Sequence, residues 1–311
     1  MSHPSTGRVT VLGSFMTDLV ARAPRRPLAG ESLIGTDFGM FVGGKGNNQA
    51  IAAARCGAAV SIIGRVGDDL FAQPFFDTLA QNQIDSRYVT RDAQAGTGAA
   101  MIVIEPNGQN SIIIMPRANL QLTPADVEIA REAFSGAAVV LAQLEVPIPT
   151  VLAGARLARE SGARFLFNPA PAPAEKLPDE LLRLTSIIAP NEVEAAHISG
   201  IPTGDHQGAL AAARALLERG PEEVVMTLGE RGALWVTGSH DELLPPFQVT
   251  QVDATAAGDA FCGALAAALA LGQPMPSALR WATAAGALAV TKLGAAPSLP
   301  TRAEIEELLK K

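Results

Sequence analysis

Short runs of branched aliphatic residues alternate with helical patterns along most of this chain, and the alternation restricts the folds that it can form. Residues 9–13 and 60–64 predict strands, and residues 45–55 between them predict a helix. Units in which a helix joins two such strands build a parallel sheet with helices on both faces. We therefore predict an α/β fold with a mostly parallel central sheet.

The alternation continues toward the C-terminus. Further strands are predicted at residues 138–144, 164–167, 186–188 and 223–228. Further helices are predicted at residues 71–81, 150–160, 192–198 and 209–219. Asp68 and Asp69 are placed to cap the helix at 71–81. Residues 260–279 carry no charge, but Gly272-Gln273-Pro274 interrupts them, so we predict a buried helix, a break and a second helix rather than a membrane span.

Two regions depart from the alternation. Residues 31–42 and 97–115 have strand character with few helical signals, and Pro106-Asn107-Gly108 predicts a hairpin turn inside the second region. These strands either form a small separate sheet, which would cover a ligand as a lid, or extend the main sheet. The pattern alone leaves both arrangements open. Since no Ser/Gly-rich or Pro-rich linker divides the chain, residues 1–311 are predicted to form one domain.

Composition excludes several classes of function. The chain has 311 residues, 48% of them apolar, and a formal net charge of −7. This acidic balance argues against binding nucleic acid or an anionic membrane through general charge. Cys56 and Cys262 lie in apolar helical patterns, as expected of buried thiols in a soluble cytoplasmic protein, and the four histidines lack metal-ligand spacing.

Small residues lead directly into the helix predicted to start near Gly258. In Ala256-Ala257-Gly258-Asp259 they leave the backbone N–H groups accessible, and a helix N-terminus attracts anions. Asp259 either stabilises the helix dipole only, or accepts the proton of a hydroxyl that attacks a phosphoryl group held by those amides. The motif Gly43-Gly44-Lys45-Gly46 is either a plain tight turn or one whose backbone approaches a small polar ligand.

Six motifs in one order make the chain similar to a known family. It resembles the phosphofructokinase-B-type family of carbohydrate and nucleoside kinases from about residue 8 to residue 300, which implies a ribokinase-like three-layer sandwich with a β lid near residues 15–20, 31–43 and 97–115. The motifs are Gly43-Gly44-Lys45-Gly46-x-Asn48-Gln49, Gln143-Leu144-Glu145, Asn168-Pro169-Ala170-Pro171, Pro190-Asn191-Glu192-x-Glu194, Thr227-Leu228-Gly229-x-x-Gly232 and Asp253-x-Thr255-x-Ala257-Gly258-Asp259.

The resemblance implies phosphorylation of D-ribose at O5 by ATP. Asp259 would be the catalytic base, and the amides of Ala256, Ala257 and Gly258 the anion hole. The sugar would contact Met16, Asp18, Gly43, Gly44, Lys45, Gly46, Asn48, Glu145 and Asp259. Asp18 and Glu145 each follow a predicted strand, at the sheet edge where open α/β sheets bind ligands. Two subunits would pair through the lid as a homodimer.

The resemblance also implies sites for ATP, Mg²⁺ and K⁺. Without the resemblance, a helix cap with an acidic first turn explains Asn191 and Glu194 best. With it, they would hold the magnesium–phosphate end of ATP through water. The nucleotide would contact Asn191, Glu194, Thr227, Leu228, Gly229, Glu230, Arg231, Gly232, Gly258 and Thr283. The monovalent cation would be bound by Asp253, Thr255, Ala289, Lys292, Gly294 and Ser298.

The match has one departure that bears on the substrate. Met16 stands where bacterial relatives carry Asn, and a thioether cannot donate a hydrogen bond to a sugar hydroxyl. Ribose, 2-deoxyribose and other small sugars therefore remain candidate substrates. A related kinase for a ketohexose or nucleoside is a further alternative, and so is a catalytically silent sugar-binding protein, which the presence of Asp259, Gly258 and Glu194 disfavours.

Overall fold

A nine-stranded central sheet organises the molecule in the computed structural model, which describes residues 7–310. The strand order is β13-β12-β11-β10-β9-β8-β1-β4-β5, and only the pairings of β12 with β11 and with β13 are antiparallel. In that order the strands are Asp241–Leu244, Ala233–Thr237, Glu223–Thr227, Ile187–Ile188, Arg164–Phe167, Val139–Ala142, Arg8–Leu12, Ala59–Gly67 and Asp85–Asp92.

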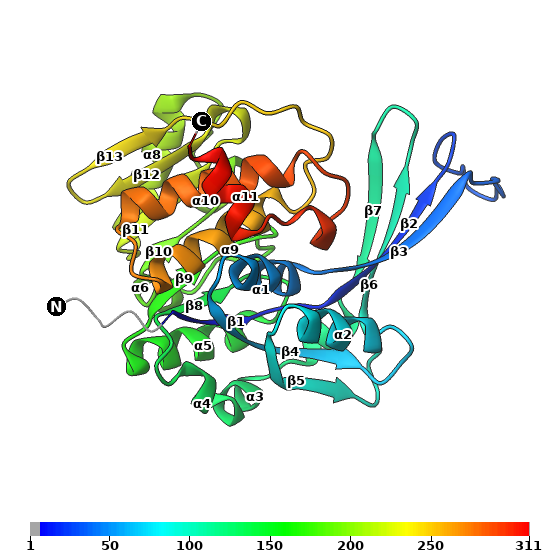
Figure 1. The fold of residues 1–311 in the computed structure, drawn as a ribbon, viewed down its shortest axis with the longest axis horizontal. Helices are drawn as coiled ribbons and strands as arrows, with labels where there is room; N and C mark the ends of the chain where they lie inside the picture. The colour runs from blue at the N-terminus through cyan, green and yellow to red at the C-terminus, as the bar shows by residue number, and fades with distance from the viewer. Residues whose placement is uncertain (1–6, 311) are drawn as a thin grey trace.

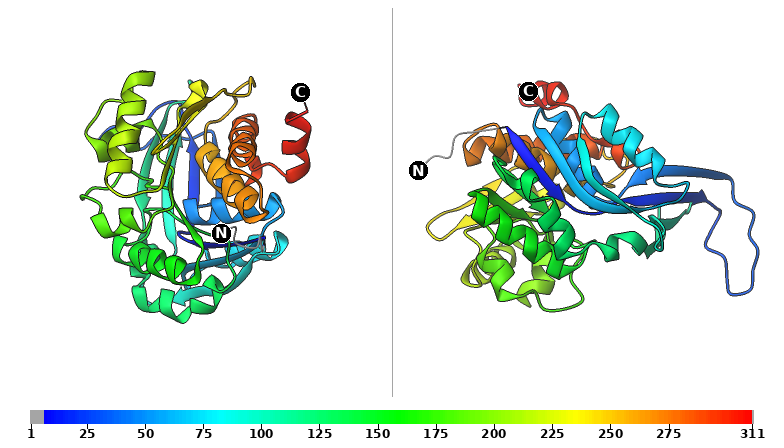
Figure 2. Two further views of the ribbon diagram at one scale, coloured as in Figure 1. Left: turned by 90° about the vertical axis from the view of Figure 1, so that its left-hand side faces the viewer. Right: turned by 90° about the horizontal axis from the view of Figure 1, so that it is seen from below.

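Helices cover both faces of this sheet (Figures 1 and 2). One layer comprises α1 (Lys45–Arg55), α2 (Gln73–Gln81), α9 (Ala257–Ala270), α10 (Met275–Ala289) and α11 (Arg302–Leu308). The other comprises α3 (Pro124–Ile129), α4 (Arg131–Phe134), α5 (Ile148–Ser161), α6 (Asp179–Arg183), α7 (Glu192–Ser199) and α8 (His206–Glu218). Short 3₁₀ turns lie at Arg117–Gln121 (η1), Gly229–Arg231 (η2) and Ala296–Ser298 (η3). The predicted parallel sheet between helical layers is confirmed.

The four strands outside the main sheet form a second, smaller one. Its order is β3-β2-β6-β7, and Figure 1 shows it projecting away from the nine-stranded sheet. The strands are β2 (Met16–Arg22), β3 (Asp37–Gly43), β6 (Gly98–Ile104) and β7 (Asn110–Met115). β6 and β7 pair antiparallel as the predicted hairpin. Of the two arrangements left open by the sequence, the separate sheet is present.

Helix α9 is buried on nearly every side because it lies between α1, α10 and the sheet. Gly263 is required where α9 meets α1: a Cβ placed on it would lie 2.5 Å from Ala52 Cβ and 2.6 Å from the Gln49 carbonyl oxygen. The small residues of α9 thus allow α1 to approach, and α1 carries part of the site described below. Helix α9 ends at Ala270 and α10 begins at Met275, which confirms the predicted pair of helices.

Three sequence predictions need correction or completion. The helix predicted from residue 71 begins at Gln73, after Ala72, which has no side-chain cap. Asp69 accepts the Phe71 amide at 3.1 Å in the turn before the helix, and it also accepts the backbone amide and hydroxyl of Thr97. The predicted strand at 31–42 begins only at residue 37. The sequence analysis missed β5, β12 and β13 altogether. Between residues 7 and 310, no helix is long and apolar enough to cross a membrane.

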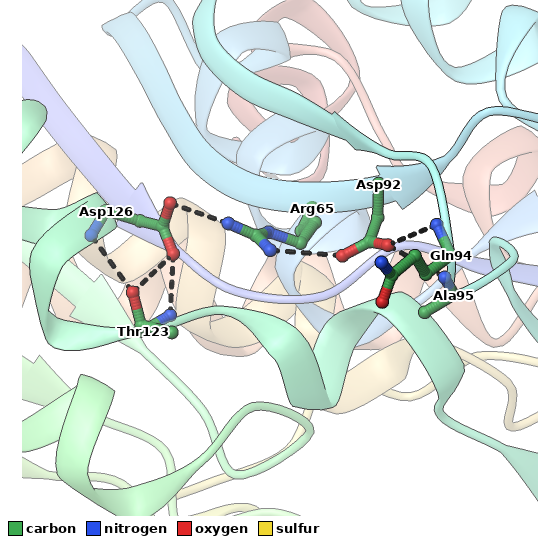
Figure 3. Close-up of polar contacts among 6 residues, drawn as sticks. All are labelled: Arg65, Asp92, Gln94, Ala95, Thr123 and Asp126. Carbon is green, nitrogen blue, oxygen red and sulfur yellow. Dashed lines mark hydrogen bonds and ion pairs between the residues drawn. The ribbon is translucent and has the colours of Figure 1, made fainter.

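Arg65 of β4 connects three parts of the fold (Figure 3). Its guanidinium donates to Asp92 at the end of β5 at 3.0 Å and to Asp126 of α3 at 2.7 Å. Asp92 also accepts the amides of Gln94 and Ala95, and Asp126 completes a capping box with Thr123. The arginine therefore ties the sheet edge to α3 and to the segment that enters the small sheet.

We predict that Arg65→Met lowers the free energy of unfolding by about 1–3 kcal/mol, because two carboxylates lose their partner in a site where Arg65 is only 22% exposed. Arg87→Met is the matched control: Arg87 pairs with Asp85 but is 64% exposed, so its loss should lower the free energy of unfolding much less than the loss of Arg65. Urea denaturation of the two variants measures both values. Equal losses would show that the Arg65 bridge contributes no more than a surface ion pair.

Candidate active site

Asp259 lies in the first turn of α9, with only 6% of its surface exposed. Asn48 Nδ2 donates to its Oδ2 at 2.9 Å, and Gln49 Nε2 donates to its Oδ1 at 3.0 Å. Both donors belong to α1, so the helix contact described above sets the orientation of the carboxylate. A carboxylate only accepts, so both α1 amides must present their NH₂ groups to Asp259.

The backbone before Asp259 turns sharply into the helix. Ala256 adopts a left-handed conformation with φ of 61°, and a Cβ placed on Gly258 would meet nothing within 4 Å. The first amides of a helix have no partner within it, so those of Gly258 and Asp259 are available for an anion. The amide of Ala257 is partly engaged, since it donates to the Ala254 carbonyl oxygen at 3.3 Å.

A cavity of about 750 Å³ adjoins this helix start. Seven of the residues predicted to contact the nucleotide line it: Asn191, Thr227, Gly229, Glu230, Gly232, Gly258 and Thr283. Its wall also includes residues that the sequence analysis missed, among them Phe247, Phe261, Gly286, Ala287 and Val290. Apolar residues of this kind form no sequence motif that predicts ligand binding. The fold places them beside Gly229, Gly232 and Gly258.

Three predicted nucleotide contacts lie elsewhere among the described residues. Leu228 is buried in the core between the sheet and the second helical layer, and Arg231 pairs with Glu192. Glu194 forms a capping box with Asn191: its Oε2 accepts the Asn191 amide at 2.8 Å, and the Asn191 side-chain oxygen accepts the Glu194 amide at 2.8 Å. Burial raises the pKa of Glu194, and the charge of Asp259 adds to that effect.

Further ionisable side chains lie close to Asp259. Asp18 of β2 packs so closely on Gly43 that a Cβ there would collide with its carboxylate. Burial raises the pKa of Asp18 to about 7, with further contributions from the charges of Glu145 and Asp259. Lys45 provides the compensating cation: burial alone would lower its pKa, but Asp259, Glu145 and Glu194 outweigh that effect and raise it.

Glu145 anchors the glycine turn that precedes α1. Its Oε2 accepts a 2.5 Å hydrogen bond from the Ser14 hydroxyl and one of 2.9 Å from the Lys45 amide. Gly44, with φ of 89°, and Gly46 pack against the backbone of residues 13–16, where a Cβ would clash. The sequence analysis did not single out Ser14. Its position just after the first strand is the only signal that the sequence offers.

Two further residues of the predicted sugar site have informative surroundings. The Oδ1 atom of Asn48 is buried and has no hydrogen-bond partner in the described chain, so it can accept a hydrogen bond from a ligand. Met16 is 3% exposed and lies two residues from Asp18 on β2, so both side chains point to the same face of the strand.

The residues predicted to bind a monovalent cation come from two loops that lie together. Asp253 accepts the amide and hydroxyl of Thr255 through one oxygen and the Gly294 amide through the other. Partial burial opposes ionisation of Asp253, but these hydrogen bonds lower its pKa. Lys292 extends away toward Glu304 at 2.6 Å, and Ser298 donates to the Ala295 carbonyl oxygen. Ala289 is the last residue of α10.

Residues 6–302 match the model of the pfkB family carbohydrate kinases. The chain therefore belongs to the pfkB family of carbohydrate kinases and is an ATP-dependent sugar kinase.

Several known proteins are similar to this chain over nearly all of its length. A ribokinase of Haemophilus influenzae is 38% identical over 97% of this chain and 98% of its own length. A deoxyribokinase of Salmonella typhi is 35% identical, with 97% and 98% covered. A bifunctional ribokinase/ribose-5-phosphate isomerase A of Fructilactobacillus sanfranciscensis is 41% identical over 96% of this chain, which spans only 55% of that protein.

Solved structures agree with the fold. The structure of Arabidopsis thaliana ribokinase complexed with ribose and ATP superposes with a TM-score of 0.90 at 30% identity, covering 97% of this chain and 98% of the other. The predicted ribokinase-like sandwich is confirmed.

The elevated pKa of Asp18 predicts a cost in stability. Because folding raises this pKa from 3.8 to about 7, the folded state binds the proton more tightly, and ionising Asp18 destabilises the protein as pH rises through that window. Asp18→Asn should therefore increase the free energy of unfolding above pH 7 by on the order of 1 kcal/mol. Near pH 4, where Asp18 is protonated in the folded protein, it should have little effect.

Thermal unfolding at pH 4 and pH 8 measures this difference. Asp37→Asn, at the exposed start of β3, serves as the control and should show no comparable pH-dependent gain. A variant of Asp18 that is destabilised at pH 8 would contradict the assigned burial and repulsion.

Proposed function

We propose that this enzyme transfers the γ-phosphoryl group of ATP to O5 of D-ribose, giving ribose 5-phosphate and ADP. The observation that supports this most is the position of Asp259: a buried carboxylate at a helix N-terminus, between the cavity and the cluster of Asp18, Asn48 and Glu145. Relatives named ribokinase, and a ribokinase structure complexed with ribose and ATP, support the choice of sugar.

In the proposed reaction Asp259 accepts the proton of the O5 hydroxyl as that oxygen attacks the γ-phosphorus. The O5–P bond forms while the bond between the γ-phosphorus and the β–γ bridging oxygen breaks, and ADP leaves with that electron pair. The anion hole comprises the amides of the segment from Ala256 to Gly258, with Gly258 the least encumbered. Fixed N–H groups stabilise the charge that develops on the transferred group without reorganising.

The sugar site consists of the residues around the glycine turn. Asp18 accepts hydrogen bonds from two hydroxyls, and Asn48 Oδ1 gains a partner when a third hydroxyl donates to it. Glu145 and the backbone of Gly43, Gly44 and Gly46 complete the pocket, and Lys45 neutralises part of the carboxylate charge. The small sheet acts as a lid over this pocket.

The cation sites fit the residues present. Asn191 and Glu194 already satisfy one another in the capping box, so they would hold Mg²⁺ through water rather than directly. Magnesium neutralises phosphate charge when bound. K⁺ would lie between the loop of Asp253 and Thr255 and the segment after α10, bound mostly by backbone carbonyl groups and directly by the Asp253 carboxylate.

The small sheet also supports a homodimer. It exposes large apolar side chains that a monomer would leave in water: Phe38, Met40, Phe41, Met101, Ile112, Ile113 and Ile114. Phe38, Met40, Met101 and Ile113 share one face of the sheet, and Phe41, Ile112 and Ile114 share the other. Exposed apolar side chains gathered on one sheet face mark an interaction site. A second copy of the chain, pairing sheet to sheet, would cover it.

The alternative substrate is 2-deoxyribose, and Met16 favours it. The side chain of Met16 shares a strand face with Asp18 and offers no hydrogen bond to a hydroxyl at C2. A relative named deoxyribokinase is also similar over nearly the whole chain.

For the catalytic base we predict that Asp259→Asn reduces kcat by roughly 10³-fold or more, because the amide cannot accept the proton. ATP binding should change by less than about threefold, since Asp259 does not line the nucleotide cavity within the described chain. ADP release on ribose, 2-deoxyribose, fructose and adenosine measures the first value, and calorimetric titration the second. Turnover near that of the unaltered enzyme would reject Asp259 as the base, and an unaltered enzyme that phosphorylates no sugar would reject the kinase proposal.

For specificity we predict that Met16→Asn raises the ratio of kcat/KM for ribose to kcat/KM for 2-deoxyribose by about 10-fold, corresponding to one hydrogen bond of about 1.4 kcal/mol. Met16→Leu, which is apolar and of similar size, is the matched control and should leave the ratio unchanged. A ratio that moves equally in both variants would show that Met16 acts through packing only.

A further inference from the structure

Gln49 belongs to a chain of three buried amides that ends on Asp259. Gln143 Nε2 donates to Gln49 Oε1 at 2.5 Å, and Gln49 Nε2 donates both to Asp259 Oδ1 at 3.0 Å and to Asn168 Oδ1 at 3.1 Å. Asn168 Nδ2 in turn donates to the Ala189 carbonyl oxygen at 2.8 Å. Gln49 and Gln143 are wholly buried and Asn168 is 7% exposed.

The backbone carbonyl at Ala189 fixes the direction of every bond in this chain. A carbonyl oxygen only accepts, so Asn168 must present Nδ2 to it and Oδ1 to Gln49. Gln49 must then present its NH₂ group to Asn168, and the same group reaches Asp259. Its remaining oxygen accepts from Gln143. Reversing Gln49 would place an oxygen against the carboxylate, and the network forbids that orientation.

Asp259 needs such a donor because its surroundings are mostly anionic. The ionisable groups that face it come from several elements: Asp18 on β2, Lys45 on α1, Glu145 after β8, Glu194 on α7 and Cys262 on α9. One cation among three carboxylates leaves a local excess of negative charge. A hydrogen-bond donor aimed at the charged form of Asp259 opposes that repulsion.

We propose that Gln49 is a positioning residue for the phosphoryl transfer, oriented by Gln143 and Asn168, which fixes the Asp259 carboxylate and keeps it ionised near neutral pH. The proposal rests on Asp259 being the catalytic base. Gln49 is wholly buried, so it does not contact a bound substrate. It acts on the reaction through its hydrogen bond to Asp259. Asn48 differs: it also donates to Asp259, but its own unpartnered oxygen is assigned to the sugar.

Gln49→Met tests the proposal because it retains the length of the side chain and removes its donor. Kcat should fall about 10- to 100-fold, as for other partners that orient a reacting group, while KM for ATP and sugar changes by less than about threefold. The acid limb of the kcat–pH profile should move to higher pH, since an unsupported carboxylate ionises less readily. Gln143→Met, one bond further from Asp259, should give a smaller shift in the same direction.

Asn47→Ala is the matched control on the same helix. Asn47 is wholly buried and, among the described residues, neither of its side-chain polar atoms has a partner, so truncating it perturbs α1 without touching Asp259. It should leave the pH profile in place. Thermal unfolding of all variants measures any general loss of stability.

The outcomes separate this proposal from the assignment of the base. If Gln49→Met lowers kcat only in proportion to its loss of stability, with the acid limb unmoved, the positioning role is wrong even where Asp259→Asn is inactive. If Asp259→Asn remains active, the assigned base itself fails. In the Asp259→Asn background, Gln49→Met should cause no further loss of kcat, because the two residues act as one unit.

Discussion

The contact between α1 and α9 is the constraint on which the site depends. It brings the two amide donors of α1, Asn48 and Gln49, to the carboxylate of Asp259 at 2.9 and 3.0 Å. The approach is possible only because α9 presents Gly263 and alanines to α1, with no room for a Cβ at Gly263. The small residues of α9 therefore allow the close helix contact, and that contact fixes the position of the Asp259 carboxylate.

The glycine turn before α1 serves two functions through the same contacts. Its close packing on residues 13–16 positions α1, and the hydrogen bond from the Lys45 amide to Glu145 fixes an acidic side chain beside Asp18. Burial, with further contributions from the charges of Glu145 and Asp259, raises the pKa of Asp18 to about 7. The protein retains an arrangement that costs stability, as expected where binding or catalysis requires it.

Much of the fold could be predicted from local patterns. The helix at 45–55, the strand at 164–167 and the hairpin of β6 and β7 carry their signals in their own residues. β5 escaped prediction because it is an edge strand with charged residues throughout and one buried side chain, so it lacks an apolar run. The helix expected from residue 71 begins two residues later, and Asp69 shares its carboxylate between the Phe71 amide and Thr97, a partner distant in sequence.

For the candidate site, sequence motifs predicted residues that the fold brings together, but they did not predict the hydrogen-bond partners of those residues. Glu145 was predicted to contact sugar, yet its bonds to Ser14 and Lys45 depend on tertiary contacts that no local pattern encodes. Leu228 and Arg231 lie within a motif whose glycines line the cavity, while their own side chains turn to the core and to Glu192. A sequence motif can therefore predict that a loop lies at the site, but the fold determines which of its residues line the cavity.

The most direct measurement is a crystal structure of the enzyme with ribose and a non-hydrolysable ATP analogue. Our account predicts the O5 hydroxyl at about 2.6–3.2 Å from the Asp259 carboxylate, and the terminal phosphate against the Gly258 amide. A sugar whose O5 points away from Asp259, or a terminal phosphate bound elsewhere in the cavity, would contradict it.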